Sequence, residues 1–151
     1  MTNFSNLVGK CLWGEFVSNS EFKTFIPIDV FVQRYDPESG KIFATSKDAF
    51  GEAEINLQLD ATKKENFRGN KVYTSLRDQD LIIPETIIEG SLVSGRGELV
   101  LKGTYFSSLS QDIQGAWQLL DSPLNIVSMG WLDPRGYSLV EEYLVGQNMG
   151  D

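Results

Sequence analysis

Alternation of apolar and polar residues is the dominant pattern along this chain. The segment EAEINLQL (52–59) alternates strictly, which predicts a β-strand with one solvated and one buried face. The segment FKTFIPIDVFVQRY (22–35) is rich in β-branched and aromatic residues and predicts a more deeply buried strand. Pro27 lies within it and cannot donate a ladder hydrogen bond, so we expect it at a strand start, an edge or a bulge.

Turn-forming residues separate the candidate strands. They occur in DPESGK (36–41), SGRG (94–97), FSSLSQD (106–112) and DPRG (133–136). Strands and turns at short spacing predict an antiparallel up-and-down meander. We therefore expect an all-β fold of about 8–10 strands closing into a barrel, with at most one short helix. The whole chain, 1–151, is expected to form this single domain.

Two segments each fit more than one type of secondary structure. Residues 61–70, ATKKENFRGN, fit either one turn of helix or a long loop. Residues 136–147, GYSLVEEYLVGQ, fit either a final strand or a short helix, because their periodicity matches both.

Glycines and large aromatic residues share strand faces near the end of the meander. In SQDIQGAWQLL (110–120), Gly115 and Trp117 point to the same side, and Gly103 and Tyr105 repeat this spacing one strand earlier. Glycine in a strand marks a bend or a neighbour that needs room. Either the glycines make space for aromatic rings in a filled core, or both line a cavity.

Three features together resemble the calycin-type barrels, the group of lipocalin, fatty-acid-binding and avidin-like proteins. They are LVGKCLWGEF as a first strand carrying Trp13, the meander of short strands, and the late strand QGAWQLL. The lipocalin pattern has glycine two residues before the tryptophan, whereas Cys11 holds that place here and Gly9 lies four residues before Trp13. The resemblance implies an up-and-down barrel that binds a small ligand.

Composition narrows the possible chemistry. The chain has 13 basic and 21 acidic residues, a net charge of −8, which disfavours binding to nucleic acid or to anionic membranes. It contains no histidine, so the commonest general base and the usual zinc ligands are missing. We assign no catalytic residue, metal or cofactor. The single cysteine, Cys11, cannot form an internal disulfide, and no secretory signal or apolar helix is recognisable, so we expect a cytoplasmic protein.

Five residues are candidates for lining a ligand cavity. Glu15 shares the parity of Trp13, which would turn it inward, and an arginine such as Arg96 would then pair with it. The alternative is a bulge near Gly14 that turns Glu15 outward. Asp29 lies among apolar residues and could also point inward; its alternative is a solvated edge position beside Pro27. The candidate set is Trp13, Glu15, Arg96, Tyr105 and Trp117. Tyr73 and Trp131 are further aromatic candidates, although aromatic residues in β-proteins commonly just fill the core.

Three functions follow from these features. The first is a small barrel that binds an apolar or amphipathic molecule in its interior. The alternative is a protein interaction module, such as an inhibitor, adaptor or assembly domain, or a homo-oligomer, with a filled core and no ligand. The third is an enzyme that shapes a reactive substrate with an arginine, a tyrosine and a carboxylate, which no motif selects.

Overall fold

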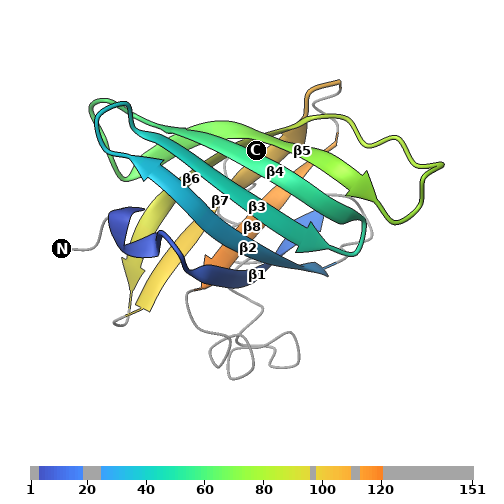
Figure 1. The fold of residues 1–151 in the computed structure, drawn as a ribbon, viewed down its shortest axis with the longest axis horizontal. Coiled ribbons are helices and arrows are strands. Elements are labelled where there is room, and N and C mark those ends of the chain that lie inside the picture. The colour runs from blue at the N-terminus through green and yellow to red at the C-terminus, as the bar shows by residue number, and fades with distance from the viewer. Residues whose placement is uncertain (1–3, 19–24, 96–97, 110–112, 121–151) are drawn as a thin grey trace, which may run out of the picture.

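The computed structural model describes residues 4–18, 25–95, 98–109 and 113–120. These residues form eight antiparallel strands in which each strand pairs with the next and β8 pairs with β1, so the sheet closes into an up-and-down barrel (Figure 1). The strands are β1 (Cys11–Ser18), β2 (Phe25–Asp36), β3 (Lys41–Asp48), β4 (Gly51–Leu59), β5 (Asn66–Leu76), β6 (Thr86–Gly95), β7 (Glu98–Ser107) and β8 (Gln114–Leu120). One 3-10 turn, η1 (Phe4–Leu7), precedes them. The all-β barrel expected from the sequence is confirmed.

Local sequence patterns explain the first half of the barrel. β4 alternates between exposed and buried positions as EAEINLQL predicts. The turn after β2 contains Gly40 with φ of 75°, a left-handed conformation that glycine adopts at no steric cost. Pro27 is the third residue of β2 and pairs with β1, whereas the ladder to β3 begins only at Ile28. The proline therefore lies near a strand start.

The two ambiguous segments have different outcomes. Residues 61–65 form the loop before β5, and Asn66 starts that strand, so the loop interpretation holds for the first half of 61–70. The segment 136–147 and the turn at 133–136 lie outside the described residues.

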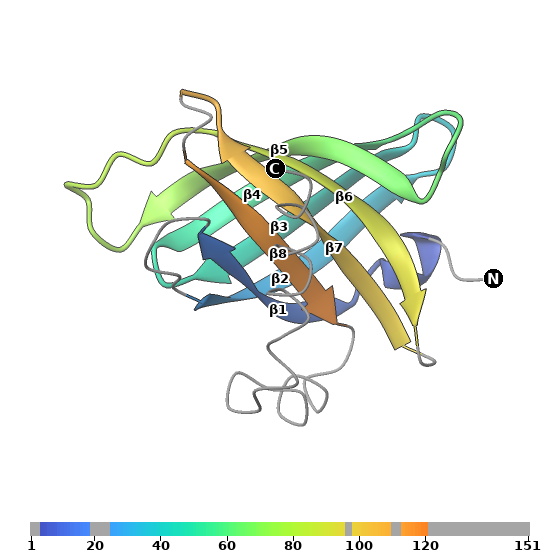
Figure 2. The same ribbon diagram turned by 180° about the vertical axis from the view of Figure 1, so that it is seen from behind.

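The turn η1 covers one end of the barrel. Phe4 and Leu7 are buried, and the Phe4 ring meets the Phe67 ring edge-on at 5.6 Å between centroids. The Gly9 amide donates a hydrogen bond of 2.8 Å to the Val32 carbonyl and so ties this turn to β2. Figures 1 and 2 both place η1 at the end opposite the long β5–β6 connection.

Glycines and aromatic residues alternate across β7 and β8. Gly103 lies opposite Trp117, and Tyr105 lies opposite Gly115. A Cβ atom on Gly115 would come within 2.6 Å of the Tyr105 hydroxyl and would overlap the carbonyl oxygen of Val17 on β1. Each glycine thus leaves room for the close approach of its neighbours on the adjacent strands.

Candidate ligand cavity

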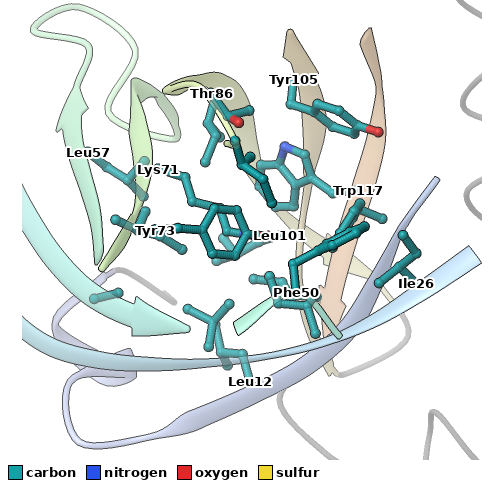
Figure 3. A pocket seen from close by; sticks show the side chains of 18 of the residues that line it. Leu12, Ile26, Phe50, Leu57, Lys71, Tyr73, Thr86, Leu101, Tyr105 and Trp117 are labelled. Carbon is teal, nitrogen blue, oxygen red and sulfur yellow. The ribbon is translucent and has the colours of Figure 1, made fainter. Parts of the chain in front are cut away.

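The barrel encloses a cavity of about 420 Å³. Its wall is formed by inward-facing side chains of all eight strands, by η1 and by the β5–β6 connection. These side chains are overwhelmingly apolar, and Lys71 is the only charged residue among the described residues that line the cavity. Figure 3 shows Lys71 and Tyr73 projecting into the space bounded by Phe50, Leu101 and Trp117. The interior is therefore hollow despite its close glycine–aromatic packing.

Aromatic rings form one wall of the cavity. The rings of Phe16 and Tyr105 meet edge-on with centroids 5.9 Å apart, and Trp117 lies 5.9 Å from Phe67. The Trp117 Nε1–H donates a hydrogen bond of 3.1 Å to the Thr104 carbonyl, which fixes the orientation of the indole in the cavity wall. Burial raises the pKa of Tyr105 to about 12, so its phenol is neutral at physiological pH.

A polar cluster of Lys71, Tyr73 and Asp48 interrupts the apolar wall. Lys71 Nζ donates to Asp48 Oδ2 at 2.7 Å and to the Tyr73 hydroxyl at 3.0 Å. The Tyr73 hydroxyl in turn donates to Asp48 Oδ2 at 2.6 Å. The other carboxylate oxygen, Asp48 Oδ1, accepts 2.8 Å from the Phe50 amide. The Asp48 side chain is 0% exposed and that of Lys71 is 9% exposed, so the ion pair is desolvated.

Burial sets the protonation behaviour of this cluster. It lowers the pKa of Lys71, because an ammonium loses its hydration in the cavity, and Asp48 opposes this effect by stabilising the ammonium. Burial together with the neighbouring Asp48 carboxylate raises the pKa of Tyr73. Tyr73 therefore stays protonated and acts as a hydrogen-bond donor.

Only some of the residues that the sequence predicts to line a cavity do so in the structure. Tyr105 and Trp117 line the cavity, as does Tyr73. Trp13 and Glu15 do not, because Leu12, Phe16 and Ser18 supply the inward side chains of β1. Arg96 and Trp131 lie outside the described residues.

Glu15 is buried although it faces away from the cavity. It is 2% exposed, and its Oε2 atom has no hydrogen-bond partner within the described residues. Burial raises its pKa from 4.5 to about 7. The register of β1 with both neighbouring strands is continuous, so normal strand alternation, without a bulge at Gly14, gives this orientation. Asp29 is exposed, which agrees with its solvated alternative, although β2 is paired on both sides.

Sequence reasoning missed Lys71 and Asp48. Lys71 shares its strand face with Phe67 and Tyr73, and Asp48 shares its face with the buried Ile42. This parity was the available signal. It was overlooked because a lysine or aspartate in an alternating strand is usually read as solvated.

Exposed apolar residues surround the end of the cavity opposite η1. Ile82 is 91% exposed, Leu109 80% and Ile113 60%, and Ile82 and Ile113 also contribute to the cavity wall. The Ser108 amide donates a hydrogen bond of 2.8 Å to the Glu85 carbonyl, which ties the residue that follows β7 to the residue that precedes β6. We call Leu81, Ile82, Leu109 and Ile113 the apolar rim.

The described residues contain neither a cluster of metal ligands nor a membrane-spanning helix, and the chain matches no known protein family. Among the residues that the structure describes, no three side chains of histidine, cysteine, aspartate or glutamate come together as a metal site requires. No helix in the described ranges has the length and apolar character needed to cross a bilayer. Comparison of the chain with models of known protein families, with curated proteins and with solved structures finds no match.

Proposed function

We propose that this protein binds one small apolar or amphipathic molecule inside the barrel. The cavity carries the proposal: its volume of about 420 Å³ lies in the usual range for small-molecule sites. Its largely apolar wall would take up the body of the ligand, and the cluster of Lys71, Tyr73 and Asp48 would orient a polar end. Binding removes apolar ligand surface from water, which supplies the driving force.

The barrel architecture supports this function. An interior formed by eight strands is just wide enough for one small ligand when its side chains do not fill it. We extend the proposal to membership of the calycin-type barrels, which the closed order β1 to β8 supports. Since one fold hosts many functions, the argument for binding rests on the cavity itself.

Cellular location belongs to the same proposal. Cys11 is the only cysteine, so this chain cannot form the internal disulfides that stabilise proteins of oxidising compartments. The net charge of −8 further disfavours nucleic acid as a partner. We therefore propose a cytoplasmic binding protein without a nucleic-acid partner.

Titration with decanol, an uncharged amphipathic alcohol, tests the function. Trp117 lines the cavity whereas Trp13 does not, so the variants W117F and W13F form a matched pair. We expect a saturable change in tryptophan emission for the wild type and for W13F, and loss of that change in W117F. An identical change in W117F, or no saturable change in any folded variant, would contradict binding in the cavity. Displacement of the neutral dye Nile red provides an independent measure of occupancy.

The apolar rim supports the second candidate function, a protein interaction module. Its exposed side chains (Ile82, Leu109 and Ile113) lie on loops joined by the Ser108–Glu85 hydrogen bond, and exposed apolar patches commonly mark interaction sites. If decanol and Nile red both fail to bind the folded protein, this alternative becomes the better account. Loss of self-association or of partner binding in I82S would then support it.

A further inference from the structure

The ion pair in the cavity wall restricts the charge that the polar end of a ligand can carry. Lys71 is paired with Asp48 at 2.7 Å, and the Asp48 carboxylate is fully buried, so the two charges compensate each other. A ligand carboxylate would compete with Asp48 for the ammonium and would add an uncompensated negative charge to an apolar interior. An uncharged oxygen, such as a carbonyl, instead accepts hydrogen bonds without this cost. The cavity therefore favours a neutral polar end.

The position of Lys71 suits a reaction with such a carbonyl. Its Nζ atom lies 4.9 Å from the centre of the Phe16 ring and 4.6 Å from that of Tyr73, so the flexible side chain is held between two rings. Burial lowers the pKa of the amine, which increases its unprotonated fraction. An unprotonated lysine in an apolar pocket is the usual nucleophile for Schiff bases with carbonyl compounds.

We propose that Lys71 captures an apolar aldehyde reversibly as a Schiff base inside the barrel. The proposal rests on the binding function above and specifies the ligand class for the same cavity. Lys71 lies opposite Thr86 at the start of β6, next to the connection that carries Ile82. The aldehyde carbon would react there, and the apolar chain would extend past Trp117 towards Phe4.

The reaction uses groups that the cluster already contains. The ammonium of Lys71 first transfers one proton to the Asp48 carboxylate. The resulting amine attacks the aldehyde carbon, a C–N bond forms as the C=O π bond breaks, and the oxygen takes up the proton that the attacking nitrogen loses, which gives a neutral carbinolamine. The C–O bond then breaks, and the hydroxyl leaves as water with a proton supplied from the Asp48–Tyr73 pair. The net reaction converts aldehyde and ammonium into protonated imine and water, so the positive charge stays beside Asp48.

Reductive trapping with decanal tests the proposal. The folded protein is incubated with substoichiometric decanal and sodium cyanoborohydride, and the alkylated lysine is located by peptide mass mapping. We expect Lys71 to be labelled at least about tenfold faster than exposed lysines such as Lys47, because the cavity would hold the aldehyde carbon beside this amine, and groups held together react faster than free partners. Labelling spread over the exposed lysines, with Lys71 unlabelled, would overturn the proposal.

Two variants test whether the label requires the amine of Lys71 itself. K71R keeps a positive charge beside Asp48 but offers no amine, so we expect it to lose the specific label whatever its affinity for decanol. K47M removes an exposed lysine, whose side chain is 73% exposed, and should keep the label. If K71R does not fold, the peptide map of the wild type decides alone.

Non-covalent binding distinguishes failure of this proposal from failure of the binding function. If decanal displaces Nile red but Lys71 is not labelled, the Schiff base is wrong and the binding function stands. If neither decanal nor decanol displaces the dye and Lys71 is not labelled, both proposals are wrong.

Discussion

Glu15→Gln should stabilise the protein, and the gain should grow with pH. Glu15 is 2% exposed, and its Oε2 atom lacks a hydrogen-bond partner within the described residues. The amide of glutamine has nearly the same shape and no charge. The substitution therefore removes the cost of holding an ionised group in a buried position while changing the packing little.

The size and sign of the effect follow from the pKa of Glu15. Folding raises that pKa from 4.5 to about 7, so the folded state binds a proton that the unfolded state has released. The free energy of unfolding of the wild type therefore falls as pH rises from 4.5 to 7 and then levels off. The full cost is about 3 kcal/mol above this window. Between about pH 5 and about pH 8, the advantage of E15Q should grow by about 2.5 kcal/mol.

Urea denaturation followed by tryptophan fluorescence measures this difference. Urea denaturation curves of the wild type, of E15Q and of the control E54Q are recorded at both pH values. Glu54 lies on an exposed position of β4, so E54Q removes the same charge without relieving burial, and we expect no comparable pH-dependent gain. An advantage of E15Q that is equal at both pH values, or that E54Q reproduces, would refute the reasoning.

Three further substitutions test the cavity and its closed end by urea denaturation. Asp48→Asn leaves the Lys71 ammonium buried without its counter-charge and should cost about 3–5 kcal/mol; the double variant D48N/K71M should recover most of that loss, and no recovery would argue against the ion pair. Gly90→Ala places a Cβ atom 2.6 Å from Cζ2 of Trp117 and should cost about 1–3 kcal/mol through overpacking; an unchanged urea midpoint would count against this contact. Phe4→Ala should cost about 3–5 kcal/mol because the ring is buried at the η1 end, whereas a loss below about 1 kcal/mol would show that η1 is not part of the folded core.

The fold could be predicted where only one face of a strand is buried. β4 is such a strand, and its alternation gave both its extent and its orientation. β1 is different: the buried residues include Leu12 on its inner face and Val17 on its outer face. When both faces are buried, alternation no longer distinguishes them. This is why the sequence assigned Trp13 and Glu15 to the cavity while Leu12 and Phe16 occupy it.

The candidate site was predictable only in its aromatic part. Trp117 and Tyr105 were recognisable because a glycine two residues before each marks the inner face of a curved sheet. The Lys71–Asp48 pair joins residues 23 positions apart through the register of β3, β4 and β5. That register is a property of the folded sheet, so the strand parity of each residue indicates which face it lies on but does not indicate that the two residues pair.

The most direct measurement of the central claim is isothermal titration calorimetry of the folded protein with decanol. We expect one decanol per chain and a binding enthalpy that becomes more negative with temperature, since burial of apolar surface lowers the heat capacity. Ala44 is buried and lines the cavity, so A44L should fill part of the space and weaken binding. Heats equal to those of dilution, or binding that A44L leaves unchanged, would contradict a ligand in the barrel.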